Sequence, residues 1–176
     1  MKVLLVNPEY PITYWSFRHA LSFEGKRSAF PPLALTTISS MLPRSWERRL
    51  VDLNVRPLKS SDIEWADIVF ATAMLVQKES LIKIVERCKA RGKRVVVGGP
   101  FITSAIEKIP GVDHIFVGEA EATLPIFISD MERGEAKEVY QAAERPSLSD
   151  TPIPDFGLAD LKRYSMMNVQ YSRGCP

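Results

Sequence analysis

The chain has 176 residues, of which 45% are hydrophobic and 25% charged, with 23 Lys and Arg against 21 Asp and Glu. This length supports one domain with its own core plus an appendage, and a net charge of +2 excludes the basic stripe of an extended nucleic-acid interface. No run approaches the roughly 18 apolar residues of a membrane span, and neither a signal peptide nor a disulfide framework is recognisable. We therefore expect a cytoplasmic protein that is not an integral membrane protein.

The chain opens on a continuous apolar run at residues 2–6 (KVLLV), which predicts a strand buried on both faces of a parallel sheet. Asn7-Pro8 ends this strand, and a long loop leads to Pro31-Pro32. A helix is predicted over residues 33–42, because the first turn of a helix tolerates proline. The second and third strands are predicted at residues 49–53 (RLVDL) and 67–72 (DIVFAT).

The second half repeats the alternation. The strongest helix pattern covers residues 79–91 and ends at Gly92, with one apolar stripe formed by Leu81, Ile84, Val85 and Cys88. Cys88 is therefore interpreted as a core residue. Further strands are predicted at residues 94–97 and 114–117, further helices at residues 104–109 and 122–133, and a candidate edge strand at residues 139–141.

Strands that alternate with helices imply right-handed crossovers and a parallel, doubly wound α/β sheet. We predict a Rossmann-like, flavodoxin-like domain over residues 1–142, with five parallel strands in the order 2-1-3-4-5 and helices on both faces. The proline-rich residues 143–165 predict a linker. Residues 166–171 (MMNVQY) predict one further strand, which begins a segment of residues 166–176 and has no partner in the sequence.

In sheets of this type, ligands bind outside the carboxyl ends of the strands. The residues predicted there are Asn7, Pro8, Thr72, Ala73, Gly98, Gly99, Pro100, Gly118, Glu119 and Glu121. The glycines allow a ligand to approach the backbone closely, although glycines after strands also simply form turns. The two glutamates fit an acid–base pair or ligand acceptors, and equally fit the start of a helix, where the helix dipole favours acidic residues.

Several motifs are absent from the sequence. There is no GxGxxG after the first strand and no GxxxxGK[ST], which argues against dinucleotide binding and nucleoside-triphosphate hydrolysis. His19 lies in the long aromatic loop after strand one and His114 begins strand five, where it is interpreted as structural; neither has the spacing of a metal ligand. A receiver-like signalling domain needs acidic residues at the ends of strands one and three, where this chain has Asn7 and Thr72.

Six stretches occur in one order: LLVNPEYP (residues 4–11), FPPLAL (30–35), VVVGGPF (95–101), VDHIFVGEAEAT (112–123), SLSDTPIPDFGLADLKRY (147–164) and YSRGCP (171–176). Together they resemble the N-terminal half of radical S-adenosylmethionine enzymes that carry a cobalamin-binding domain. The resemblance implies that the first domain is a Rossmann-like cobalamin module, with the ten strand-end residues as its candidate cofactor contacts.

The same resemblance implies that Cys175 is the first cysteine of a CxxxCxxC motif that binds a [4Fe–4S] cluster. One thiolate cannot hold such a cluster. The chain is therefore expected to be an inactive fragment of a longer enzyme, whose C-terminal barrel would bind the cluster and S-adenosylmethionine. The intact protein would perform methyl transfer or other radical chemistry on a small-molecule or lipid-like substrate that the sequence does not identify.

One motif departs from the best-known cobalamin domains. They carry DxHxxG after the first strand, whereas this chain has Asn7-Pro8-Glu9-Tyr10 there. The resemblance implies that cobalamin is held without a protein histidine. The alternative is a Rossmann-like module without a cofactor, which docks a substrate or another protein.

Overall fold

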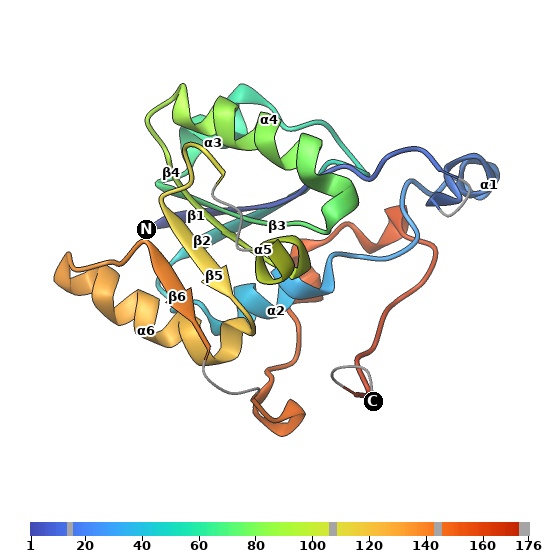
Figure 1. Ribbon diagram of the computed structural model, residues 1–176. Helices are drawn as coiled ribbons and strands as arrows, with labels where there is room; N and C mark the ends of the chain where they lie inside the picture. The colour runs from blue at the N-terminus through green and yellow to red at the C-terminus, as the bar shows by residue number, and fades with distance from the viewer. Residues whose placement is uncertain (14–15, 106–108, 143–145, 173–176) are drawn as a thin grey trace.

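The computed structural model describes residues 1–13, 16–105, 109–142 and 146–172. Its centre is a six-stranded sheet in the order β2-β1-β3-β4-β5-β6, and each neighbouring pair is parallel (Figure 1). The strands are β1 (Lys2–Asn7), β2 (Glu47–Asp52), β3 (Ile68–Thr72), β4 (Arg94–Gly98), β5 (His114–Val117) and β6 (Val139–Gln141). The predicted order of the first five strands is thus confirmed.

The predicted number of five strands is wrong, because β6 joins the sheet beside β5. Residues 139–141 were only a candidate edge strand in the sequence, since three residues are too short for a clear periodicity. Pairing with β6 satisfies backbone groups along the outer edge of β5, and an open edge is unfavourable in a sheet.

The helices cover both faces of the sheet, as predicted (Figure 1). One face packs against α3 (Ser60–Trp65), α4 (Lys78–Lys89) and α5 (Pro100–Ala105), and the other packs against α2 (Leu33–Met41) and α6 (Ala120–Arg133). The short helix α1 (Arg18–Phe23) lies at the tip of the loop after β1, away from the sheet. No helix in the described part of the chain is long and apolar enough to cross a membrane.

The helix predicted at residues 104–109 begins four residues earlier than predicted, because α5 runs over Pro100–Ala105. The chain turns at Gly99, whose φ of 100° favours glycine, and α5 begins at Pro100 directly after β4. Proline suits the first position of a helix because that N–H has no helical partner. Residues 106–108 lie outside the described part of the chain. Helices α1 and α3 were not predicted, because six residues give too few turns for a recognisable stripe.

An aromatic cluster holds α6 against the sheet. Phe127 of α6 is fully buried, and its ring meets those of Phe70, Phe116 and Tyr140 edge-to-face at centroid distances of 6.0, 5.3 and 5.4 Å. Because Tyr140 lies on β6, this cluster also fixes the sixth strand to the domain.

The predicted linker does not run free of the domain. Residues 146–168, here called the C-terminal strap, fold back over it through the short helices η3 (Leu148–Asp150), η4 (Phe156–Leu158) and η5 (Leu161–Arg163). The Asp155 N–H donates to the Thr36 carbonyl at 2.9 Å, and the Ser40 hydroxyl donates to the Ile153 carbonyl at 2.7 Å. The proline-rich composition thus marks an irregular segment, and tertiary contacts decide that it is packed.

The strap then pairs with the end of the long first loop. The N–H groups of Arg27 and Ser28 donate to the Arg163 carbonyl, and the Met166 N–H donates to the Ala29 carbonyl at 2.9 Å. Tyr164 and Ser28 form an isolated parallel bridge. The strand predicted at residues 166–171 is wrong, since the described residues there pair in no ladder. A strand needs a neighbouring strand to satisfy its backbone groups. In this segment the backbone pairing with the first loop ends at Met166, whose N–H donates to Ala29.

We expect Phe127→Ala to lower the free energy of unfolding by about 3–5 kcal/mol, because the cavity it leaves lies within a closely packed cluster. Phe23→Ala is the matched control, since Phe23 is 93% exposed and its loss should change stability by less than about 0.5 kcal/mol. Urea unfolding followed by circular dichroism measures both. Equal effects would contradict the assignment of Phe127 to the core.

Tyr164 attaches the strap to the domain through a buried carboxylate. Its hydroxyl donates to Asp52 Oδ2 at 3.0 Å, and both residues are buried. Tyr164→Phe should lower the free energy of unfolding at neutral pH by about 1–3 kcal/mol, because it removes a hydrogen bond to a buried charged group. Tyr171→Phe, at a residue 96% exposed, should change nothing measurable in the same urea titration.

The Tyr164→Phe penalty should also depend on pH. Burial raises the pKa of Asp52, although hydrogen bonds from Asn54, Asn7 and Tyr164 oppose the shift. Because the folded state holds this proton more tightly, the contribution of Asp52 to stability is largest below its unfolded pKa and falls as pH rises through its folded pKa. The Tyr164 hydroxyl favours the charged form, so its removal should cost more as pH rises through the same range. A penalty that is constant or shrinks with rising pH would contradict this.

Candidate functional site

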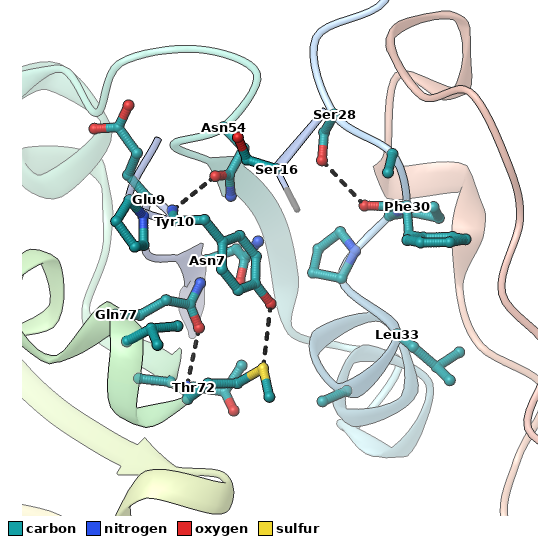
Figure 2. Close-up of a pocket in the computed structure, with 18 of the residues that line it drawn as sticks. Asn7, Glu9, Tyr10, Ser16, Ser28, Phe30, Leu33, Asn54, Thr72 and Gln77 are labelled. Atoms are coloured by element: carbon teal, nitrogen blue, oxygen red, sulfur yellow. Dashed lines mark hydrogen bonds between the residues drawn. The ribbon is translucent and has the colours of Figure 1, made fainter. Parts of the chain in front are cut away.

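A cavity opens where the strand order reverses. Strand β2 pairs with one edge of β1, and β3 pairs with the opposite edge. The loop after β1 and the loop after β3 therefore lead away from each other at the carboxyl ends of these strands. The cavity between them, here called the switch-point cavity, has a volume of about 660 Å³ (Figure 2). Its lining comprises residues 7, 9–13, 16–17, 27–34, 54, 72–74, 76–77, 100 and 168. Small-molecule sites typically have volumes of roughly 300–1,000 Å³.

The walls of the cavity are mostly apolar and aromatic. Phe30 and Leu33 belong to the lining on one side of the cavity and Tyr10 and Met74 to the lining on another, and Figure 2 shows the Tyr10 ring between the two sides. The Tyr10 hydroxyl lies 3.7 Å from the sulfur of Met74. Burial, with a further contribution from the Asp52 carboxylate, raises the pKa of Tyr10. The cavity thus offers apolar contact with a few polar groups.

The loop after β1 is tied to the loops after β2 and β3. The Pro8 carbonyl accepts hydrogen bonds from Gln77 Nε2 at 2.6 Å and from Asn54 Nδ2 at 3.2 Å. The Tyr10 N–H donates to Asn54 Oδ1 at 2.8 Å, and Gln77 Oε1 accepts from the Met74 N–H (Figure 2). These side-chain amides hold three separate loops in one arrangement around the cavity.

A buried carboxylate lies behind this wall. Asp52 Oδ1 accepts from Asn7 Nδ2 at 3.0 Å and from both the N–H and Nδ2 of Asn54 at 2.9 and 2.7 Å. Its other oxygen accepts from Tyr164 of the strap. Asp52 therefore orients Asn7, which lines the cavity, and at the same time binds the C-terminal strap.

The structure brings four of the ten predicted strand-end residues into the cavity lining: Asn7, Thr72, Ala73 and Pro100. Pro8, Gly98 and Gly99 are not among the described residues that line the cavity. Gly118, Glu119 and Glu121 lie one strand farther along, after β5, and are not among the described residues that line the cavity. Cys175 lies outside the described residues.

Gly99 supports the wall from behind. A Cβ atom at this position would lie 2.3 Å from Thr72 Oγ1 and 3.1 Å from the N and O atoms of Ala73. Thr72 and Ala73 both line the cavity. The missing side chain of Gly99 thus allows β4 to pack closely against the end of β3.

The residues after β5 serve the architecture around α6. The Gly118 N–H donates to Thr103 Oγ1 at 3.0 Å, Glu119 is the N-cap residue of α6, and Glu121 lies in its first turn. Glu121 Oε1 also accepts from the Thr151 hydroxyl at 2.9 Å, which holds the strap near the start of α6. The helix-start interpretation of the two glutamates agrees with this placement.

The two histidines lie apart from the cavity. His19 is exposed on α1, whereas His114 is buried and its Nδ1–H donates to the Lys137 carbonyl at 2.6 Å. No histidine is among the described residues that line the cavity. Within the described part of the chain, no group of three or more His, Cys, Asp or Glu side chains is placed to hold a metal ion.

Sequence reasoning missed most of the polar lining. Asn54, Gln77 and Asn168 come from loops or from the strap, and nothing in their local sequence distinguishes them from surface amides. The available signal was the length and aromatic content of the loop after β1, since long loops in compact domains are often functional. That loop supplies Tyr10 and Phe30 to the cavity lining. From the sequence, however, His19 was the residue of this loop that was considered as a candidate.

A family model described as B12 binding domain matches residues 27–128. An uncharacterized methyltransferase of Synechocystis sp. is 41% identical over 100% of this chain, and the hopanoid C-2 methylase of Rhodopseudomonas palustris is 32% identical over 99% of it. The bacteriochlorophyllide d C-12(1)-methyltransferase of Chlorobaculum tepidum is 27% identical over 82% of the chain.

The chain spans about a third of the length of each of these relatives, namely 33, 34 and 33%. The family match covers the segment from the end of the first loop to the middle of α6, and so includes β2 to β5 and the walls contributed by Phe30, Leu33 and Thr72. The chain belongs to the B12-binding domain family.

Proposed function

We propose that this chain binds cobalamin in the switch-point cavity and presents it to the rest of a longer methyl-transferring enzyme. The observation that carries the proposal is the position of this apolar cavity. It lies at the carboxyl ends of β1 and β3, where the order of a parallel sheet reverses and ligands bind. Membership of the B12-binding domain family supports cobalamin as the ligand.

The residues of the cavity fit the chemistry of this cofactor. A corrin is a broad, largely apolar macrocycle with amide groups around its rim, and the cavity combines apolar walls with amide and hydroxyl groups. Asn168 belongs to the lining, and its Oδ1 is buried without a hydrogen-bond partner among the described residues, so this side chain could turn to offer an acceptor to a bound molecule. The absent side chain of Gly99 further allows the close wall formed by Thr72 and Ala73.

The chain's own part is to hold and shield the cofactor. Tyr10, Phe30, Leu33 and Met74 would supply apolar contact, and Asn7 would offer a polar side chain oriented by Asp52. When bound, cobalamin supplies a cobalt–carbon bond from which a methyl group can be transferred. The protein contributes binding, orientation and the exclusion of water, while the cofactor carries the chemistry.

The intact protein would complete this chemistry. On the resemblance described above, we propose that Cys175 is the first ligand of a [4Fe–4S] cluster in a C-terminal barrel that binds S-adenosylmethionine. The named methylase and methyltransferase relatives support methyl transfer as the reaction. We also propose the division into a cofactor domain at residues 1–142, a connecting segment at 143–165 and the start of the barrel at 166–176.

The proposed binding is tested with hydroxocobalamin. Purified protein is incubated with this cofactor and then desalted. It should retain a corrin absorption band whose intensity corresponds to about one cofactor per protein chain. A melting temperature that rises with cofactor concentration should accompany it, because a ligand that binds the folded state stabilises it.

The same experiment separates the two candidate functions. Protein that keeps its circular dichroism spectrum but retains no corrin and shows no thermal shift would contradict cofactor binding and favour the docking module.

A second test addresses the wall behind the cavity. Gly99→Ala should weaken hydroxocobalamin binding by about tenfold or more, because the new Cβ displaces Thr72 and Ala73 from their present positions. Gly92→Ala is the matched control: Gly92 also has a positive φ, of 66°, but a Cβ there would meet nothing within 4 Å. Both variants carry backbone strain, so equal affinities in equilibrium dialysis would contradict a specific role for Gly99.

A further inference from the structure

We propose that Asn168 of the C-terminal strap is a cofactor-binding residue, whose side-chain carbonyl accepts a hydrogen bond from an amide N–H at the rim of the corrin. This inference rests on the proposed function and extends the cofactor site beyond the strand ends. It assigns one wall of the site to the segment that leads out of the module.

The backbone just before Asn168 is held against the cavity. The Tyr164 hydroxyl is bound to the buried Asp52 carboxylate, the Ser165 N–H donates to the Ser28 carbonyl at 3.1 Å, and the Met166 N–H donates to Ala29. Ser28 and Ala29 themselves line the cavity. Asn168 follows Met166 by two residues and lines the same cavity, so its position is set by contacts that do not involve its own side chain.

The side chain of Asn168 has an unmet requirement. Its Oδ1 is buried, yet no atom in the described part of the chain donates a hydrogen bond to it. Buried acceptors in folded proteins nearly always have a partner, and leaving one without a partner is unfavourable. The second such atom among the described residues is Arg48 Nε, whose guanidinium already donates through NH2 to the carbonyls of Leu42 and Pro43. Of these two residues, Asn168 belongs to the cavity lining, so a rotation of its side-chain amide would present Oδ1 to a bound molecule.

A bound cofactor would supply the missing donor. The amide groups around a corrin carry N–H donors, and a side-chain carbonyl on an otherwise apolar wall can orient one of them. A small number of well-placed polar groups fixes orientation in mostly apolar sites. The cofactor would then contact both the strap and the sheet. Cofactor binding would therefore stabilise the position of the strap on the domain.

The test compares three proteins by equilibrium dialysis with hydroxocobalamin. Asn168→Leu keeps the approximate size of the side chain and removes the acceptor, and we expect about tenfold weaker binding than wild type. Gln170→Leu is the matched control, because it makes the same chemical change two residues away at an exposed position. Its affinity should equal that of wild type.

Stability without cofactor distinguishes a binding role from a structural one. Because Asn168→Leu removes an unpaired buried acceptor, the melting temperature of the cofactor-free variant should be unchanged or higher. A clear decrease, with an affinity loss that a general weakening of the fold explains, would contradict the inference. Asn168→Asp keeps an acceptor oxygen at this position and should bind the cofactor more tightly than Asn168→Leu; equal weakness of the two would contradict the acceptor role.

Hydrogen exchange gives a readout of this stabilisation of the strap. Saturation with hydroxocobalamin should slow amide exchange in residues 164–168 of the wild type and should slow it less in Asn168→Leu. Wild-type protein that binds no hydroxocobalamin would overturn the proposed function and this inference together. Wild-type binding with an unaltered affinity of Asn168→Leu would overturn only the inference, and would indicate that water satisfies the carbonyl.

Discussion

The position of β1 between β2 and β3 is the constraint on which the site depends. Both neighbours are parallel to β1. The chain therefore leaves the carboxyl end of β1 toward β2 on one side and later adds β3 on the opposite side. Loops that diverge in this way cannot fill the space above the strand ends, and a crevice remains there. The cavity therefore follows from strand order, and the side chains of the loops determine only its lining and its chemistry.

The network centred on Asp52 makes that lining a single unit. A carboxylate with only 4% of its surface exposed needs several donors, and it takes them from the side chains of Asn7, Asn54 and Tyr164 and from one backbone N–H. Those donors belong to the end of β1, to the loop after β2 and to the strap. A buried charge thus joins three segments that are far apart in the sequence, and it connects the wall of the cavity to the C-terminal strap.

The fold was largely predictable because each element carries a local signal. Continuous apolar runs marked the buried parallel strands, and the stripe that includes Leu81 and Cys88 marked α4, whose core position is confirmed. Short elements gave no such signal: β6 has three residues and α1 and α3 have six each. The candidate site was predicted less well. Asn7, Thr72, Ala73 and Pro100 follow from strand ends, whereas Tyr10, Asn54, Gln77 and Asn168 reach the cavity through loops whose course no local pattern encodes.

The sequence by itself determined the α/β class, the order of the first five strands and the family resemblance, because these depend on local hydrophobic periodicity and on short stretches that occur in a characteristic order. Tertiary structure alone decided that the proline-rich segment packs as a strap, that Glu121 binds Thr151 and that Asn168 lines the cavity. These features depend on contacts between residues that are tens of positions apart. Such contacts form only when the folded sheet brings their segments together.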